Sequence, residues 1–289
     1  MKNAGLTLTV VVEVQSANFG EGFGNISTLK KFTRGNGLQY TYIARQALRY
    51  SLVEQLGWDT TLVEAQGSGE KQVCQFAPDA TIEQYPEIDL FGYMKTKKDS
   101  SAETRSAVVR LSDAISLEPF KGDLDFLTNM GLAKRVGASN ALAQSEQHRS
   151  LYSYTLTIEL DRIGIDGAIE LSQEEKAKRV LALLEEVEFL NRDIRGRREN
   201  FNPIFVIGGV YRRKNNFFQD RVVLKGLDID VTPLKSIKNS YEWLKNETFV
   251  GVLPGKVNNY IELQEELGAT EISDVFQSLA QKVREFYGI

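Results

Sequence analysis

The sequence has very few residues of the kinds that build disulfides, zinc sites or histidine-based catalysis. Among its 289 residues there is one cysteine, Cys74, and one histidine, His148. A disulfide within the chain needs two cysteines, and zinc sites with several cysteine and histidine ligands need more of both residues. A Ser-His-Asp or Cys-His catalytic pair would have to use His148. The sequence therefore excludes a disulfide scaffold and such zinc sites.

Long apolar runs are also missing. No uninterrupted hydrophobic stretch approaches the roughly 18 residues that a membrane-spanning helix needs, and the first residues do not resemble a secretion signal. The hydrophobic share of 42% is ordinary for a globular protein, which excludes bulk disorder. We expect a soluble, cytoplasmic protein with no membrane partner.

The charge of the chain is unevenly distributed. The whole chain carries 35 basic and 39 acidic residues, a net charge of −4. Residues 22–53 contain five basic residues and no acidic one, so the remainder carries −9. A locally positive stretch on an acidic molecule indicates a polyanion site, because phosphate binding responds to the local potential.

The most regular segments predict both strands and helices. Strand patterns are β-rich or alternate between apolar and polar residues, and helix patterns repeat apolar residues every three or four positions. Ser172 and Glu175 have the spacing of a capping box at a helix start. The predicted strands are 6–14, 105–117, 151–161, 203–211 and 222–231, and the predicted helices are 41–56, 172–190, 234–246 and 273–287.

Two long polar stretches with weak periodicity, 60–87 and 118–149, are predicted to be insertions. Without them the strong elements follow the order β, α, β, β, α, β. That is the order of the ferredoxin-like fold, which RNA-recognition domains share. The predicted fold class is α+β: one domain, 1–289, with a βαββαβ core and long insertions.

Arg45 and Arg49 lie four residues apart in the predicted helix, so both guanidiniums project from one face, about 6 Å apart. No acidic residue lies three or four positions before either arginine, and the preceding segment adds Lys30, Lys31 and Arg34. A charged helix face is ordinarily just solvated. These basic residues have no acidic residue in their own segment to neutralise them, and such a patch instead favours phosphate binding.

Two further basic clusters have two interpretations each. Four arginines lie within 192–198, and Arg212, Arg213 and Lys214 precede Phe217 and Phe218. Basic residues beside aromatic rings suit single-stranded nucleic acid. A solvated helix end for the first cluster and a hairpin tip for the second explain the pattern equally well.

Candidate catalytic residues are sparse. Asp123 and Asp125, in the second insertion, are candidates for metal-assisted RNA cleavage, but no third carboxylate stands at a telling spacing. His148 stands where this insertion meets the strand 151–161. A lone histidine is most often structural or merely exposed, and contact with RNA is favoured here over catalysis.

Short segments in a common order resemble a known protein family. They are SAN (16–18), TLKK (28–31), ARQALR (44–49), DLFGYM (89–94), AISLEP (114–119) and YSYTLTIEL (152–160). Together they resemble the CRISPR-associated Cas-seven proteins of the DevR type, the repeated backbone subunit of type I Cascade complexes, and among these subtype I-B. The resemblance covers most of the chain, and its segments are individually short and weakly specific.

The resemblance implies an RNA-recognition-type palm with a finger insertion over 57–87 and a thumb insertion over 116–149. Copies would stack head to tail along the CRISPR guide RNA, each thumb folding over RNA held by a neighbour. Other Cascade subunits and the target DNA paired to the guide are the further partners. The implied RNA-binding residues are Asn18, Lys30, Lys31, Arg45, Gln46 and Arg49 on the palm, with added charge from Arg34, and Lys134, Arg135 and His148 in the thumb insertion.

The residues agree with that role. The chain lacks the aromatic pattern with which RNA-recognition domains stack bases. Its basic residues suit phosphates, and phosphate contacts position a strand without reading its sequence. A subunit that holds a guide RNA needs contacts of this kind, because the guide bases must stay free to pair with the target. The hypothesis is a non-enzymatic, sequence-independent guide-RNA-binding subunit without metal or cofactor. The alternative is a metal-dependent ribonuclease of the same superfamily that cuts target RNA from a thumb aspartate, Asp123 or Asp125.

Overall fold

The strand predicted over 6–14 forms the centre of the main sheet. The computed structural model describes residues 4–15, 18–22, 24–66, 72–96, 102–139 and 142–289. The central strand β1 (Gly5–Val14) is buried along almost its whole length. It pairs antiparallel with β13 (Ser150–Glu159) on one side and with β18 (Phe205–Tyr211) on the other. Two of the predicted strands, 151–161 and 203–211, are therefore confirmed as the neighbours of the first.

Within the described residues the main sheet contains eight strands, and all of the pairings between them are antiparallel. The order along the sheet is β21 (Thr248–Val252), β18, β1, β13, β10 (Ala114–Ser116), β4 (Gln39–Ile43) and β3 (Lys31–Thr33), and β9 (Val109–Leu111) also pairs with β13.

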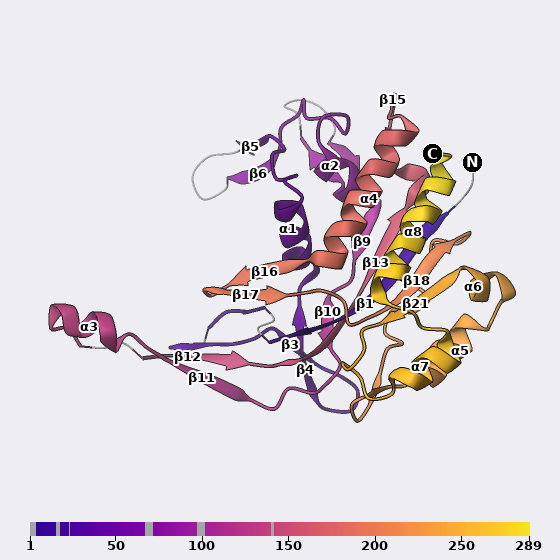
Figure 1. The fold of residues 1–289 in the computed structure, drawn as a ribbon. Helices are drawn as coiled ribbons and strands as arrows, with labels where there is room; N and C mark the ends of the chain where they lie inside the picture. Colours follow the sequence, from indigo (N-terminus) through magenta and orange to yellow (C-terminus); the bar gives the residue numbers. More distant parts are fainter. Residues whose placement is uncertain (1–3, 16–17, 23, 67–71, 97–101, 140–141) are drawn as a thin grey trace.

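Helices cover both faces of this sheet (Figure 1). Leu6, Leu8 and Val10 of β1 pack in one cluster with α1, α4 and α8. Val11 points to the opposite face and packs with α5, α6 and α7. The eight helices of the described residues are α1 (Arg45–Gln55), α2 (Pro86–Phe91), α3 (Met130–Val136), α4 (Gln173–Phe189), α5 (Val231–Lys238), α6 (Glu242–Glu247), α7 (Tyr260–Leu267) and α8 (Ile272–Tyr287), besides the 3₁₀ turn η2 (Leu160–Arg162).

Small sheets surround the main one. The three-stranded sheet joins β11 (Asp123–Thr128), β12 (Leu142–Gln147) and β2 (Ile26–Ser27). The two-stranded sheets are β5 (Val63–Gln66) with β6 (Val73–Phe76), β7 (Tyr93–Lys95) with β8 (Glu103–Arg105), β14 (Ile165–Asp166) with β15 (Ile169–Glu170), β16 (Asn191–Ile194) with β17 (Arg197–Asn200), and β19 (Leu224–Lys225) with β20 (Asp228–Ile229).

The helix predicted over 41–56 begins four residues later than expected. Thr41 to Ile43 belong to β4, and α1 starts at Arg45. Aromatic and β-branched residues favour a strand here, and β3 and β10 supply hydrogen-bonding partners on both sides. The helix predicted over 234–246 is likewise two helices, α5 and α6, separated at 239–241. The predictions of α4 and α8 are confirmed, and Ser172 caps α4 by accepting a hydrogen bond from the Glu175 N–H at 3.2 Å.

The insertion predicted over 118–149 is regular, contrary to the expectation of weak structure. Strands β11 and β12 form an antiparallel hairpin with α3 at its far end, and the hairpin projects well away from the main sheet (Figure 1). We call residues 123–147 the projecting hairpin. Its sequence looked irregular because β11 and α3 are almost entirely exposed and burial in β12 is confined to its base, so no buried stripe imposes a period on it.

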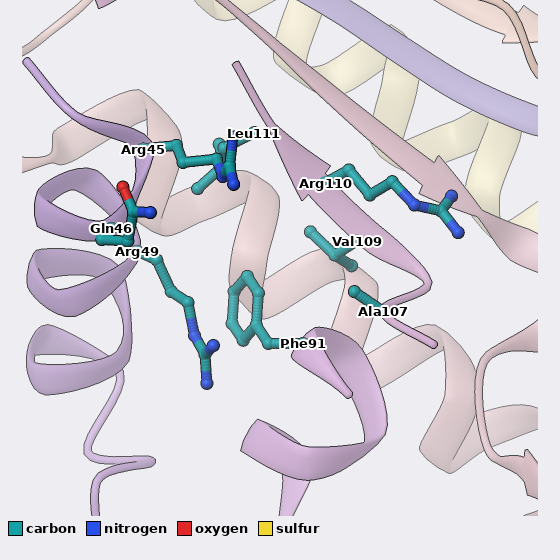
Figure 2. A pocket seen from close by; sticks show the side chains of 8 residues that line it. All are labelled: Arg45, Gln46, Arg49, Phe91, Ala107, Val109, Arg110 and Leu111. Atoms are coloured by element: carbon teal, nitrogen blue, oxygen red, sulfur yellow. The ribbon is translucent and has the colours of Figure 1, made fainter. Parts of the chain in front are cut away.

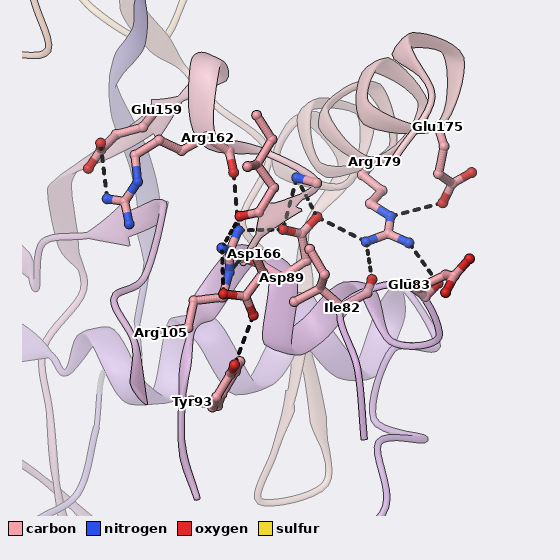
Figure 3. Close-up of polar contacts among 12 residues, drawn as sticks. Ile82, Glu83, Asp89, Tyr93, Arg105, Glu159, Arg162, Asp166, Glu175 and Arg179 are labelled. Atoms are coloured by element: carbon pink, nitrogen blue, oxygen red, sulfur yellow. Dashed lines mark hydrogen bonds and ion pairs between the residues drawn. The ribbon is translucent and has the colours of Figure 1, made fainter. Parts of the chain in front are cut away.

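A buried carboxylate ties four separate segments together (Figure 3). Asp89 of α2 is completely buried and accepts hydrogen bonds from Arg105 at 2.6 Å, Arg179 of α4 at 2.9 Å and the Gly164 N–H at 3.0 Å. Arg179 also donates to the Ile82 carbonyl oxygen at 2.7 Å. The network fixes α2 against α4 and so positions the segment that follows α1.

These elements make a mixed α/β fold built on an antiparallel sheet. In the described part of the chain, no helix combines the length and the apolar character needed to cross a membrane.

Candidate nucleic-acid interface

The start of α1 is held by side chains from two other segments. Its N-cap residue Ala44 has no side-chain oxygen, so the first N–H groups need outside acceptors. Asn18 Oδ1 accepts from the Ala44 N–H at 3.2 Å, and Asp113 Oδ1 accepts from the Arg45 N–H at 2.7 Å. The Asn18 carbonyl oxygen also accepts from the Lys30 N–H at 2.7 Å. Asn18 therefore brings the Lys30 segment next to the N-terminus of α1.

The exposed face of α1 opens into a hollow of about 510 Å³. Figure 2 shows the α1 side chains on one side of it and those of the β9 segment on the other, with Phe91 between them. The lining residues are Arg45, Gln46, Arg49, Phe91, Ala107, Val109, Arg110 and Leu111. We call this space the α1 hollow. Three of the residues predicted to bind RNA line it together.

Three arginines give the α1 hollow its charge. Arg45 is exposed and, among the described residues, has no carboxylate within 4 Å of its guanidinium. Arg49 donates to Glu87 at 3.1 Å and lies 5.0 Å from the centre of the Phe91 ring. The sequence pattern missed Glu87 as a partner of Arg49, because it comes from α2, 38 residues away.

Arg110, on the opposite wall, forms an ion pair with Glu159 and remains half exposed. Burial disfavours the charged form of Glu159, but hydrogen bonds from Arg110, Lys214 and Arg162 outweigh it and hold the pKa of this carboxyl at about 2. Glu159 is therefore ionised at neutral pH and anchors three cations at once. Arg110 and Phe91 are residues of the hollow that the sequence analysis missed, since a single arginine in a strand pattern carries no spacing signal.

Lys31 is already engaged within the protein. Its Nζ lies 2.6 Å from Glu146 Oε1 and 2.7 Å from Oε2, and 4.4 Å from the centre of the Phe120 ring. Glu146 Oε2 also accepts from the Leu29 N–H at 2.7 Å. Because Glu146 belongs to β12, this ion pair fastens the base of the projecting hairpin to the main sheet. We call it the Lys31–Glu146 pair.

The other predicted basic residues lie in two further places. The guanidinium of Arg34 lies over the Tyr40 ring at 4.2 Å, beside β3 and β4. Lys134 and Arg135 are exposed in the last turn of α3, where they complement the C-terminal end of the helix dipole. Figure 1 places α3 far from α1, so one chain does not bring these two groups to the same hollow.

His148 is buried, which removes it from the accessible surface. Its side chain is 6% exposed, and Nδ1 lies 2.7 Å from the Thr41 hydroxyl, which is 2.6 Å from the Tyr152 hydroxyl. The Phe120 ring packs edge-on against it at 5.5 Å. Burial lowers the pKa of His148, so the imidazole is neutral at pH 7. The geometry gives this side chain a packing role at the hairpin base, and its contact with RNA stays a prediction.

The two aspartates of the ribonuclease alternative lie on β11. Asp123 and Asp125 are exposed and two residues apart, so their side chains point to the same face of the hairpin. In the part of the chain that the structure describes, no three His, Cys, Asp or Glu side chains are grouped as ligands for one metal ion.

Comparison with protein families decides the kinship. Residues 6–224 match the model of a family described as the CRISPR-associated negative auto-regulator DevR/Csa2. The chain belongs to the DevR/Csa2 family. The match begins in β1 and ends in β19, so it includes every residue of the α1 hollow and the whole projecting hairpin.

Relatives of this DevR/Csa2 protein agree with that assignment. A CRISPR-associated protein Cas7/Cst2/DevR from Myxococcus xanthus (strain DK1622) is 27% identical over 175 residues, which are 54% of this chain and 58% of the relative. The chain thus matches a little under three fifths of the relative's length.

Two solved chains share the fold. One, from a CRISPR RNA-guided surveillance complex in a pre-nicking state, has a TM-score of 0.65 at 11% identity and covers 96% of this chain and 100% of its own. The other, also from a CRISPR RNA-guided surveillance complex, has a TM-score of 0.58 at 15% identity and covers 98% and 99%. The likeness extends over nearly the whole chain, including segments beyond the family match.

Proposed function

We propose that this DevR/Csa2 protein binds the sugar-phosphate backbone of a CRISPR guide RNA without reading its sequence. The α1 hollow carries the proposal, because Arg45 and Arg49 project into it from one rigid helix and Arg45 has no carboxylate partner among the described residues. Two guanidiniums one helical turn apart suit two successive phosphates. Phosphate contacts leave the guide bases free to pair with a target.

The choice of RNA as ligand is supported by kinship. The solved chains with the same fold come from RNA-guided surveillance complexes. The neighbourhood of the α1 hollow adds further basic groups, since Lys30 and Arg34 lie on the segment that Asn18 holds against α1. Asn18 would then contribute to RNA binding by holding Lys30 and the start of α1 in place, in addition to any contact that its own amide makes with RNA.

The order of the sheet supports a ferredoxin-like palm. The strands β18, β1, β13 and β10 lie side by side, and in chain order they alternate with α1 and α4 as β1, α1, β10, β13, α4, β18. This is the βαββαβ order, with β4 added at the edge of β10. We assign 57–87 to a finger and 116–149 to a thumb that contains the projecting hairpin. Of the finger, residues 67–71 lie outside the described residues, as do Ser16 and Ala17 of the segment before Asn18.

Apolar groups on the thumb and finger support head-to-tail assembly of copies along the RNA. The hairpin exposes large apolar side chains, and so does the finger region beside the α1 hollow. Such patches mark interaction surfaces on soluble proteins. A thumb that covers the finger of the next copy would bury both, which is a heterologous contact that propagates. The exposed thumb residues are Leu124, Phe126, Leu127, Met130, Leu132, Val136 and Leu142, and those near the finger are Leu62, Val63, Val73 and Met94.

The complete assembly that we propose is a cytoplasmic type I Cascade effector, of subtype I-B, with other Cascade subunits and with target DNA paired to the guide. In it this chain is the repeated, non-catalytic backbone. Lys134 and Arg135, at the tip of the thumb, would then meet RNA held by a neighbouring copy, since α3 lies far from the α1 hollow of its own chain.

Charge reversal at Arg45 and Arg49 tests the proposal. With Arg45→Glu and Arg49→Glu together, RNA affinity is expected to fall at least about tenfold, and by a similar factor for unrelated sequences, because the lost contacts are to phosphates. The slope of log affinity against log salt concentration is expected to flatten by about 1.4 for two lost single-strand contacts. Fluorescence anisotropy with two unrelated guide RNAs over a series of salt concentrations measures both quantities.

A matched control carries the same charge change elsewhere. Lys178→Glu with Arg284→Glu reverses two exposed cations on α4 and α8 and should leave the salt slope almost unchanged. Equal losses in both double variants, or none in the first, would exclude the α1 hollow as the RNA site. The RNA recovered after incubation with Mg²⁺ is expected to be intact. Cleavage that Asp123→Asn or Asp125→Asn abolishes would favour the ribonuclease alternative.

A further inference from the structure

A second basic and aromatic pocket lies at the far side of the main sheet from α1. It forms where β18 ends, next to α6, and has a volume of about 440 Å³. Strands β1, β13 and β10 separate β18 from β4, the strand that leads into α1. Its lining residues are Arg212, Arg213, Asn215, Phe217, Tyr241 and Trp243. We call it the β18–α6 pocket.

Stacked aromatic rings form one wall of this pocket. The Tyr241 and Trp243 rings are stacked, with centres 5.8 Å apart and planes 20° apart. Phe217 and Tyr211 pack edge-on against Trp243 at 5.8 and 6.3 Å, which fixes its orientation. Tyr241 is nevertheless 60% exposed. A flat ring that is rigidly backed on one side and open on the other is a surface on which a planar group can stack.

Two arginines also line the pocket, next to the aromatic rings. The Arg212 guanidinium lies over the Trp243 ring at 4.6 Å, and Arg213 is exposed. Within the described residues neither arginine has a carboxylate within 4 Å. The adjacent Lys214 differs, because it pairs with Glu159 at 3.1 Å and Asp161 at 2.6 Å. The protein thus neutralises one of three consecutive cations and leaves two facing the pocket.

We propose that the β18–α6 pocket binds a segment of single-stranded nucleic acid, independently of the α1 hollow. One base would stack on Tyr241, and the flanking phosphates would pair with Arg212 and Arg213. Stacking on an aromatic ring beside cations is how proteins hold single strands with little sequence preference. Arginine and aromatic residues are also common at protein contacts, but none of the six lining residues is aliphatic or acidic. The open ring of Tyr241, beside two arginines with no carboxylate within 4 Å among the described residues, suits a base flanked by phosphates.

The test isolates this pocket from the α1 hollow. The full chain carrying Arg45→Glu and Arg49→Glu serves as the background, and the probe is a fluorescent oligothymidylate of about 10 nucleotides. In this background Tyr241→Ala and Arg213→Glu are each expected to lower affinity at least about fivefold, because each removes a stacking or phosphate contact. Tyr241→Phe, which keeps the ring, should restore binding. Arg221→Glu, the same charge change at an exposed arginine outside the lining, is the control.

Tryptophan fluorescence gives a local second readout. The chain has two tryptophans, so Trp58→Phe leaves Trp243 as the single reporter. Titration with unlabelled oligothymidylate should change Trp243 emission, and Tyr241→Ala should abolish the change. An unchanged emission at saturating oligonucleotide, or equal affinities for Tyr241→Ala, Arg213→Glu and the control, would overturn the proposal. Loss of a protein partner from the purified complex in Tyr241→Ala, with oligonucleotide affinity unchanged, would assign the pocket to a protein instead.

Discussion

At the scale of single residues, the most consequential polar group is the carboxylate of Asp89. It is completely buried and is shared by two arginines that are themselves almost completely buried. Both guanidiniums are almost completely buried, and each bonds to Asp89 and to nearby carbonyl oxygens. Each also has a second, partly exposed carboxylate within 4 Å, Asp166 for Arg105 and Glu175 for Arg179. Removing the charge would leave two buried cations without their shared counterion.

The variant Asp89→Asn is therefore expected to be strongly destabilised, by about 3–5 kcal/mol in the free energy of unfolding. Urea denaturation monitored by circular dichroism measures it. The control is Asp193→Asn, which removes an exposed ion pair with Arg198 and should cost less than about 1 kcal/mol. Similar losses in the two variants would show that the Asp89 network does not hold the fold.

His148 provides a test of pH dependence, because it is the only histidine in the chain. Burial lowers its pKa in the folded protein, whereas the unfolded chain binds a proton near pH 6.5. Below about pH 6.5 the unfolded state binds more protons than the folded state, so stability falls as the pH is lowered toward the folded pKa. Between about pH 7.5 and 5.5 the wild type should lose more stability than His148→Gln. A parallel decline in the stability of both proteins would contradict the lowered pKa of the buried His148.

At the scale of elements, α1 shows what the sequence can and cannot predict. The four-residue spacing of Arg45 and Arg49 predicted a shared face, and both residues line the same hollow. The helix start was wrong because residues 41–43 join a sheet whose partner β10 lies some 70 residues further along the chain. Long-range pairing overrides local preference in such cases. Glu87 and Arg110 escaped prediction for the same reason, since tertiary contacts bring them to α1 and to the hollow.

The projecting hairpin gives an element-scale prediction. Residues 127–143 can be replaced by an Asn-Gly turn between Phe126 and Gln144, which removes α3 and the outer strands but keeps the Lys31–Glu146 pair. The main core does not include the removed residues, so the variant should fold with its thermal midpoint nearly unchanged. It should bind RNA as isolated copies rather than as an ordered array, since the apolar thumb surface is missing.

Electron microscopy and analytical ultracentrifugation with guide RNA measure the outcome of that deletion. A point variant, Val136→Glu, serves as the milder comparison, because Val136 is 79% exposed on α3 and needs no refolding of the hairpin. Normal arrays formed by the deletion variant would contradict the assignment of the hairpin as the thumb.

At the scale of the whole molecule, β-rich, alternating and buried apolar segments predicted three of the central strands, while their order in the sheet came only from the structure. The uneven charge of the chain can be read from the sequence, but which basic residues are paired within the folded protein cannot. Lys31 lies in the positive stretch 22–53, but its charge is neutralised by an ion pair with Glu146, more than 100 residues away in the chain. Arg212 and Arg213 lie in an acidic remainder, yet they stay unpaired among the described residues. Local sequence charge thus shows which segment is basic, but not which of its cations are already paired within the protein.

The Lys31–Glu146 pair has a mechanical consequence. Together with the pairing of β12 with β2, it holds the base of the projecting hairpin, whose six-residue strands are each about 20 Å long. A rotation of the hairpin by about 10° at its base would swing the far end of its strands by roughly 3 to 4 Å, which is about one residue of strand rise. In an array of identical copies that displacement repeats at every joint. The pitch of the array would then depend on the contacts at the hairpin base, the Lys31–Glu146 pair and the β12–β2 pairing, as the lead of a screw depends on the angle of its thread.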